Sequence, residues 1–322
     1  FPVPHGAAVK AIANCEPYVQ SVSPAHSHRS AVMNAWYLAL LGWISQLFSV
    51  ANRQLSPSDS GSDDENVRDL LPYLLNGEQA FFDIGSSLNP VTDKVYKHNY
   101  KVMYGKLLLP LIAKLKLEKK VPKLLEVGYG CGMGYGEGAS VQLWKKIIGA
   151  ENNIWVADVN AHCMEKRAKL LKTKEVHVLI GDQGKSADLI RWRLESGGNF
   201  DVIIDDGGHR ASQVLTTFSE LWETINPGGI YFIEDLHIQR FPTMVSTGFP
   251  HPTDVFQSWL RQLNFGKMCS IVTLKKAFIN CSETAIDEYY NSILNNFPVP
   301  TNLSWVFCQE NSCAFGKKEP NS

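Results

Sequence analysis

Two acidic pairs and one histidine are the residues of this sequence best suited to chemistry. Asp205 and Asp206 end one apolar run, Glu234 and Asp235 end the next, and His209 follows the first pair by three residues. Carboxylates and imidazoles bind ligands and transfer protons. Capping the following helix needs only one acid, so the capping interpretation leaves the others without a role. We therefore expect a ligand-binding or catalytic site.

The element that must position these residues is a strand, loop, helix, turn and strand over residues 200–237. The run Phe200–Ile204 is apolar and β-branched, as in a strand buried on both faces. A helix follows, a turn is expected at Asn226–Gly229, and Ile230–Ile233 forms the second strand. A βαβ unit makes its two strands parallel and neighbouring, which places both acidic pairs where open α/β sheets bind ligands.

The regular alternation of strands and helices from residue 121 predicts an α/β fold, a doubly wound Rossmann-like sheet over residues 121–318. The predicted strands before the central unit are Lys123–Val127, Ile154–Ala157 and Val176–Ile180, and the predicted helices are Ser140–Ile148, Ala161–Lys172 and Ser186–Glu195. After it we expect a helix near 254–263 and strands near 269–274 and 304–315, the last a hairpin around Gln309–Ser312.

A glycine-rich loop after the first predicted strand is the candidate nucleotide site. Residues 126–132 read EVGYGCG, a pattern that alone fits a dinucleotide, a nucleoside cofactor or a tight turn. Asp158 ends the second strand, where an acid can accept hydrogen bonds from ribose hydroxyls. Asp182 ends the third strand, where it can meet an adenine edge.

The charge and length of this loop favour a cationic cofactor. A pyrophosphate-binding loop normally runs straight into its helix. Here Gly134, Gly136 and Gly138 lengthen the loop, while Glu126 and Glu137 bring negative charge that would repel a diphosphate. S-adenosylmethionine, with its sulfonium group, fits this loop better than NAD does.

Five motifs in order then match a known family; they are EVGYGCG, GASVQLWKKII, GDQGK, FDVIIDDGGH and NPGGIYFIEDLH. They resemble class I methyltransferases that methylate sugar hydroxyls on macrolides, the mycinamicin-type O-methyltransferases. The upstream stretch PVTDKVYKHNYKVMY resembles the Thr-Asp-Lys segment of that group and of related cephalosporin- and rhamnose-modifying enzymes. The resemblance covers roughly residues 85–240.

The resemblance implies a magnesium-dependent O-methyltransferase that uses S-adenosylmethionine. By position, Asp206, Glu234 and Asp235 would be the Mg²⁺ ligands, and His209 would be the general base. The implied acceptor is a hydroxyl of a sugar, a polyol or a glycosylated small molecule. The implied cofactor-binding residues are Glu126, Gly128, Gly130, Asp158, Asp182, Gln183 and Asp205.

Residues outside these motifs could complete the site. Asp93, Lys94, His98 and Tyr100 could close over the cofactor from the helical segment, and His237 and Arg240 could meet the acceptor. A catechol-type O-methyltransferase is an alternative, with Phe241, Phe249 and Phe256 as an aromatic wall. Two further alternatives are a nicotinamide-dependent oxidoreductase and a catalytically dead, membrane-tethered binding protein.

The N-terminal 66 residues are expected to lie outside the catalytic fold. Residues 1–30 read as disordered, and 56–66 as an acidic linker. The stretch 31–51 carries no charge and is about long enough to span a bilayer, although it could instead be a signal peptide or a packed helix. The charge asymmetry around an anchor at 31–51 favours a lumenal domain, and a cytoplasmic domain is the alternative.

Residues 67–120 read as a helical cap segment with breaks near Asn76 and at 86–90.

The net charge and the cysteine pattern narrow the class of protein. The 322 residues have a net charge of −1, so nothing indicates capture of nucleic acid; the oligomeric state stays open. None of the seven cysteines forms a CxxC pair, which argues against a zinc ribbon or a thioredoxin-type site. A disulfide between Cys308 and Cys313 across the predicted hairpin is left open.

Overall fold

The computed structural model describes residues 62–134, 136–149, 153–173, 175–265 and 285–320. Residues Glu65–Ser322 form one compact unit, to which the following description applies. The predicted disordered segment, the candidate anchor at 31–51 and the strand expected near 269–274 lie outside the described residues. Among the helices that are described, none is both long and apolar enough to cross a bilayer.

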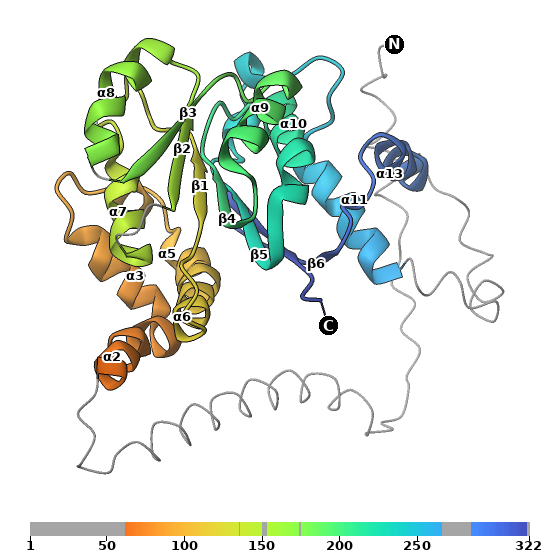
Figure 1. The fold of residues 1–322 in the computed structure, drawn as a ribbon. Coiled ribbons are helices and arrows are strands. Elements are labelled where there is room, and N and C mark those ends of the chain that lie inside the picture. Colours follow the sequence, from red (N-terminus) through yellow and green to blue (C-terminus); the bar gives the residue numbers. More distant parts are fainter. Residues whose placement is uncertain (1–61, 135, 150–152, 174, 266–284, 321–322) are drawn as a thin grey trace, which may run out of the picture. The chain divides into compact units, whose positions relative to one another are not determined.

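Seven strands form one mixed sheet in the order β3-β2-β1-β4-β5-β7-β6 (Figure 1). Neighbouring strands from β3 to β5 pair in parallel, whereas β7 runs antiparallel to both β5 and β6. The strand order reverses between β1 and β4, and open α/β sheets bind ligands at the carboxyl ends of strands beside such a reversal. The strands are β1 (Leu124–Val127), β2 (Ile154–Asp158), β3 (Val176–Ile180), β4 (Phe200–Asp205), β5 (Ile225–Ile233), β6 (Leu303–Gln309) and β7 (Ser312–Lys317).

The βαβ unit that carries both acidic pairs has the predicted parallel, neighbouring strands. Asp205 at the end of β4 is in register with Ile233 at the end of β5. The predicted turn at residues 226–229 is wrong, because these residues lie within β5. The register shifts between Phe200 and Val202, so the extra residues are absorbed as an irregularity while the strand keeps its direction. Helix α10 (Ala211–Leu221) makes the crossover.

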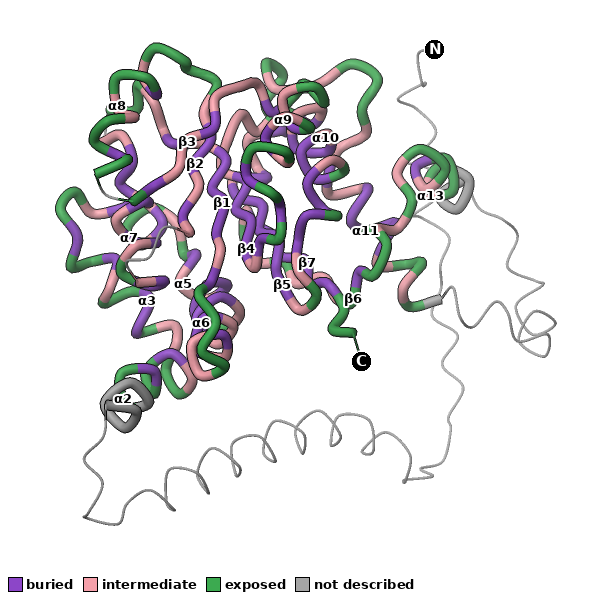
Figure 2. Tube along the Cα trace, in the orientation of Figure 1, coloured by how far each residue is buried: buried purple, intermediate pink, exposed green. Residues whose placement is uncertain are grey.

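Helices cover both faces of the sheet, as a doubly wound fold requires (Figure 1). Alternate strand residues such as Leu124 and Leu125 belong to two separate hydrophobic clusters, one on each face. Figure 2 shows the buried strands between the two helical layers. Together with the cap segment, α7 (Ala139–Ile148) and α8 (Ala161–Thr173) pack on the Leu124 face; α9 (Ser186–Ser196), α10, α11 (Pro252–Phe265) and α13 (Ala285–Asn296) pack on the Leu125 face.

The cap segment is helical, with breaks where the sequence predicted them, and it shares its core with the sheet. Phe81, Tyr104 and Ile112 are fully buried in the same cluster as the strand residue Leu124. The acidic linker predicted to end at residue 66 is wrong at its end, because a helix begins at Ser62. The segment contains α2 (Ser62–Leu75), α3 (Gly77–Ser86), α4 (Asp93–Tyr96), α5 (Lys101–Met103), the π-helical turn η1 (Tyr104–Leu108) and α6 (Leu109–Leu117).

Candidate active site

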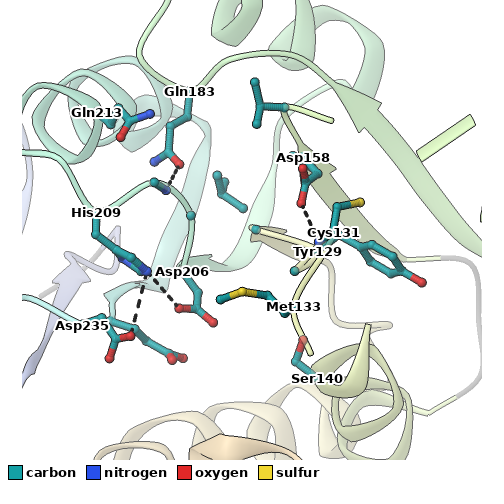
Figure 3. A pocket seen from close by; sticks show the side chains of 18 of the residues that line it. Tyr129, Cys131, Met133, Ser140, Asp158, Gln183, Asp206, His209, Gln213 and Asp235 are labelled. Carbon is teal, nitrogen blue, oxygen red and sulfur yellow. Dashed lines mark hydrogen bonds and ion pairs between the residues drawn. The ribbon is translucent and has the colours of Figure 1, made fainter. Parts of the chain in front are cut away.

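A cavity of about 260 Å³ opens at the carboxyl ends of the parallel strands. It contains most of the predicted site residues and joins the glycine-rich loop to the acidic pairs in one space (Figure 3). Asp93, Lys94 and His98 of the cap segment also line it, as predicted, whereas Tyr100, which was predicted with them, is buried and does not. The predicted site residues in its wall are Gly128, Gly130, Asp158, Asp182, Gln183, Asp206, His209, Glu234 and Asp235.

Gly128 lets the cofactor loop lie directly against the loop that carries the acids. Its φ is +105°, a conformation that side chains rarely adopt. A Cβ added at Gly128 would lie 2.0 Å from the carbonyl oxygen of Asp206. The Asp206 N–H donates to the carbonyl of Val127 at 2.9 Å, which ties the two loops together at this point.

Asp158 and Asp182 occupy the predicted positions in the cavity wall. The Asp158 carboxylate accepts from the Cys131 N–H at 3.3 Å and from the Asn160 N–H at 2.9 Å. It therefore holds the glycine-rich loop while lining the cavity, as Figure 3 shows. Asp182 accepts from the Gly184 N–H at 2.9 Å.

Gln183 and Asp205 act together behind the acidic loop. Gln183 donates to Asp205 at 2.9 Å and accepts from the Gly208 N–H at 2.7 Å. Asp205 is 1% exposed and does not line the cavity, because strand alternation turns it toward α10. Burial raises the pKa of Asp205 to about 7. Its predicted position at the cofactor is therefore wrong in this structure, and its contacts are those of a support for the loop.

Glu126 also points inward and does not line the cavity. It is fully buried, and the Ser140 hydroxyl donates to one of its oxygens at 2.7 Å. The other oxygen has no hydrogen bond to any described residue and lies 3.8 Å from the Nζ of Lys94. Burial raises the pKa of Glu126 to about 7, although the Lys94 ammonium opposes that rise.

Lys94 lies at the centre of the acidic half of the site. Its Nζ donates to Asp206 Oδ2 and to Glu234 Oε2, both at 2.7 Å, and the side chain is 1% exposed. Burial alone would lower the pKa of Lys94, but the carboxylates of Asp206, Glu234 and Glu126 together outweigh burial and raise that pKa well above its usual range. Lys94 is therefore a buried ammonium.

Two tyrosines of the cap segment each hold one further oxygen of these acids. The Tyr100 hydroxyl donates to Asp235 Oδ1 at 2.5 Å, and the Tyr104 hydroxyl donates to Glu234 Oε1. Tyr104 was not among the residues predicted from the sequence. Its signal is the spacing of four residues from Tyr100, which places both side chains on one side of a helical turn.

His209 faces two of the acids. Its Nε2 lies 3.9 Å from Asp206 Oδ1 and 3.9 Å from Asp235 Oδ2, as Figure 3 shows. His209 and Asp235 both have left-handed backbone conformations, with φ of +56° and +52°. Such conformations cost about 1–3 kcal/mol each and cluster at functional sites.

The donor set around His209 fits a divalent cation. One ligand atom each from Asp206, His209 and Asp235 lie within 4.8 Å of one another. Carboxylate oxygens are ligands that Mg²⁺ prefers. Glu234, the third ligand implied by the family resemblance, instead has both oxygens bonded to Lys94 and Tyr104.

The residues predicted to meet the acceptor are divided between the surface and the core. Phe241 is 56% exposed and Arg240 is also exposed, whereas His237 lies 6.4 Å, ring to ring, from the cavity residue His98. The aromatic wall predicted for a catechol site is wrong at Phe256. That ring is buried in the core, 4.7 Å from the ring of Phe315.

Two disulfides are present. Cys308–Cys313 closes the β6–β7 hairpin, where the sequence left such a bond open. Cys131–Cys163 links the glycine-rich loop to the first turn of α8 and was not predicted. Its signal is topological, because both cysteines follow the carboxyl ends of neighbouring parallel strands.

Comparison with known proteins shows a similarity to methyltransferases. Residues 126–236, about a third of the chain, match the methyltransferase domain family. The solved MycE methyltransferase from the mycinamycin biosynthetic pathway, in complex with Mg and SAH, has the same fold. The two chains superpose with a TM-score of 0.52 at 21% sequence identity, over 74% of this chain and 54% of the MycE chain. The resemblance seen in the motifs is thus confirmed for residues 126–236, which match a methyltransferase domain.

Two relatives are O-methyltransferases by name. The 8-demethyl-8-alpha-L-rhamnosyl tetracenomycin-C 2'-O-methyltransferase of Streptomyces olivaceus is 30% identical over 49% of this chain and 38% of its own. The mycinamicin VI 2''-O-methyltransferase of Micromonospora griseorubida is 32% identical over 37% of this chain and 28% of its own. The chain thus matches well under half the length of these two relatives.

Proposed function

We propose that this protein transfers a methyl group from S-adenosylmethionine to a hydroxyl of a sugar or glycosylated small molecule, assisted by Mg²⁺. The observation that carries the proposal is the single cavity that joins the Gly128–Gly130 loop and Asp158 to His209 and its two acids. A methyl donor and its acceptor must meet in such a space. The named activities of the relatives support an O-linked acceptor.

The nucleotide half binds and orients the methyl donor. S-adenosylmethionine supplies an electrophilic methyl group when it is bound. Asp158 lines the cavity with a carboxylate that suits ribose hydroxyls, and Asp182 lies at the end of the next strand. Holding donor and acceptor in one orientation accounts for a large part of the acceleration in such reactions.

The acidic half activates the acceptor hydroxyl. His209 would take the hydroxyl proton on its Nε2. The acceptor oxygen could then form its bond to the methyl carbon as the bond from that carbon to sulfur breaks, with S-adenosylhomocysteine as the leaving product. Asp206 and Asp235 flank that nitrogen and stabilise the imidazolium that forms. Mg²⁺ held by Asp206 and Asp235, with Glu234 if Lys94 releases it, would supply positive charge that favours the alkoxide.

The test is a product assay with labelled S-adenosylmethionine and an acceptor panel of rhamnosides, other glycosides, polyols and catechols. We expect label on a sugar hydroxyl, loss of transfer in EDTA and recovery with Mg²⁺. Calorimetry should detect binding of S-adenosylhomocysteine and none of NAD. Transfer to catechols alone, or full activity in chelator, would contradict the proposal.

A further inference from the structure

We infer that Lys94 is a positioning residue, the resident cation of the acid site, and that a divalent ion competes with its ammonium for Asp206 and Glu234. The inference rests on the proposed function only in placing a divalent ion at these acids. The inference concerns the residue that holds the carboxylates of Asp206 and Glu234 together in the metal-free protein.

The backbone delivers Lys94 to this place with little freedom. Lys94 is in the first turn of α4, and its N–H donates to the buried hydroxyl of Thr92 at 3.4 Å. From there the side chain reaches Asp206 at the end of β4 and Glu234 at the end of β5. A single ammonium thus joins the cap segment to both strands that carry the acids.

The Nζ of Lys94 occupies the position that a Mg²⁺ ion bound to Asp206 and Glu234 would need. Asp206 Oδ2 and Glu234 Oε2 are both 2.7 Å from Nζ, so a cation bound to these two oxygens would lie almost on that nitrogen. Two cations cannot share such a position, because their repulsion is large at short range in a partly dry site. A divalent ion that binds Asp206 Oδ2 and Glu234 Oε2 must therefore displace the ammonium of Lys94.

The ammonium of Lys94 does not neutralise all the negative charge of the acids. We therefore expect a divalent ion to compete with Lys94 for the site and not to be excluded from it. Lys94 is one positive charge among the carboxyl groups of Glu126, Asp206, Glu234 and Asp235. Asp206 Oδ1 and Asp235 Oδ2 still face the cavity next to His209. A divalent ion therefore remains attracted to the site, but more weakly than it would be without the ammonium.

The experiment measures Mn²⁺ binding by electron paramagnetic resonance, without methyl donor or acceptor. Lys94→Met keeps a similar side-chain length and removes the charge, so we expect Mn²⁺ to bind at least tenfold more tightly than to the wild type. Lys94→Arg keeps the charge and should bind like the wild type. The matched control is Lys106→Met, which removes an exposed lysine of the same segment that pairs with Glu78. It should change nothing.

A purely structural lysine would give another pattern. Lys94→Met would then unfold at a lower temperature, with unchanged Mn²⁺ affinity and no recovery on adding metal. Our inference also expects a lower melting temperature without metal, but one that Mn²⁺ restores, together with tighter Mn²⁺ binding. Equal affinity in the two proteins, or no binding to either, overturns the inference.

A second measurement on the wild type covers the case in which Lys94→Met fails to fold. Acetylation by an activated ester, read by mass spectrometry, should spare Lys94 in EDTA and modify it at saturating Mg²⁺. Labelling of Lys106 should stay constant. Unchanged protection of Lys94 at saturating Mg²⁺ overturns the inference. Neither measurement depends on methyl transfer. The acceptor assay can therefore fail while the inference about Lys94 holds, and the inference can fail while methyl transfer is observed.

Discussion

His209 is held in a left-handed conformation with its ring nitrogen equally far from two carboxylates. If it is the base, His209→Ala should lower kcat by about 10²–10⁴-fold, the range that general base catalysis contributes. The dissociation constant of S-adenosylhomocysteine should stay nearly the same. Stopped assays for kcat and calorimetry for binding measure the two quantities.

The matched control is His162→Ala, because His162 is an exposed residue of α8 that does not line the cavity. It should leave both quantities unchanged. Unaltered turnover in His209→Ala would remove the base assignment. A large loss of cofactor binding would instead make His209 a residue of the cofactor site.

Glu126 gives the fold a dependence on pH. Burial raises its pKa to about 7 from an ordinary 4.5, so the folded protein binds more protons than the unfolded chain between these values. Stability therefore falls as pH rises from about 4.5 to 7 and stays low above, a cost of up to about 3 kcal/mol. Glu126→Gln removes this group's contribution.

Unfolding in urea at pH 5 and pH 8, without cofactor and with EDTA, tests whether Glu126 lowers the free energy of unfolding as pH rises. Relative to the wild type, Glu126→Gln should gain stability between the two pH values, by up to about 3 kcal/mol. Parallel pH curves for the two proteins would show that Glu126 titrates normally in the folded state.

At the scale of elements, the crossover from β4 to β5 was predictable because its signals are local. Apolar runs ending in acids, joined by a helix, leave few topologies, and Asp206 and Glu234 meet as expected. Successive side chains of a strand point to opposite sides, so one of Asp205 and Asp206 must point into the core. The sequence does not show which of the two faces the ligand. The partners of these acids lie in the cap segment, 140 residues from Glu234 in the case of Lys94, and no local pattern specifies such a contact.

The glycine-rich loop and α8 are joined by the Cys131–Cys163 disulfide, which we expect to preorganise the cofactor loop. A bond that closes a separation of 32 residues removes chain entropy worth about 3–4 kcal/mol. Replacing both cysteines by serine should lower stability by about that amount. It should also weaken S-adenosylhomocysteine binding by about tenfold, because the ligand must then order the loop itself.

The hairpin disulfide offers a matched control for this loss. Cys308 and Cys313 are five residues apart and neither lines the cavity. Replacing both by serine should cost about 2 kcal/mol of stability and leave cofactor affinity unchanged. Calorimetry and urea unfolding of the two double variants compare them directly. An equal loss of affinity in both would mean that general destabilisation, not the loop, weakens binding.

At the scale of the whole molecule, the site exists only where three layers of the fold meet. The sheet supplies the acids, its loops supply the cofactor cradle, and the cap segment supplies Lys94, Tyr100 and Tyr104. Since the ring of the cap residue Tyr104 lies 4.9 Å from the ring of Phe232 in β5, the cap cannot move away as a free lid without opening the shared core. Core packing and acid orientation are therefore coupled through the same helices.

The two disulfides bear on where the molecule folds. Disulfides form and persist in oxidising compartments and are rare in the cytosol. Four of the seven cysteines are paired among the described residues. Together with the apolar stretch at residues 31–51, this pairing leads us to propose that the domain faces an oxidising compartment such as a secretory lumen.

Alkylation of thiols in intact source cells, before lysis, tests this placement. In an oxidising compartment Cys131 and Cys163 should escape a permeant alkylating agent and appear by mass spectrometry as one linked peptide pair, as should Cys308 and Cys313. In the cytosol, glutathione would keep all four as thiols and all four would be alkylated. Alkylation of Cys131 and Cys163 alone would leave the lumenal placement standing and mark the loop disulfide as the more easily reduced.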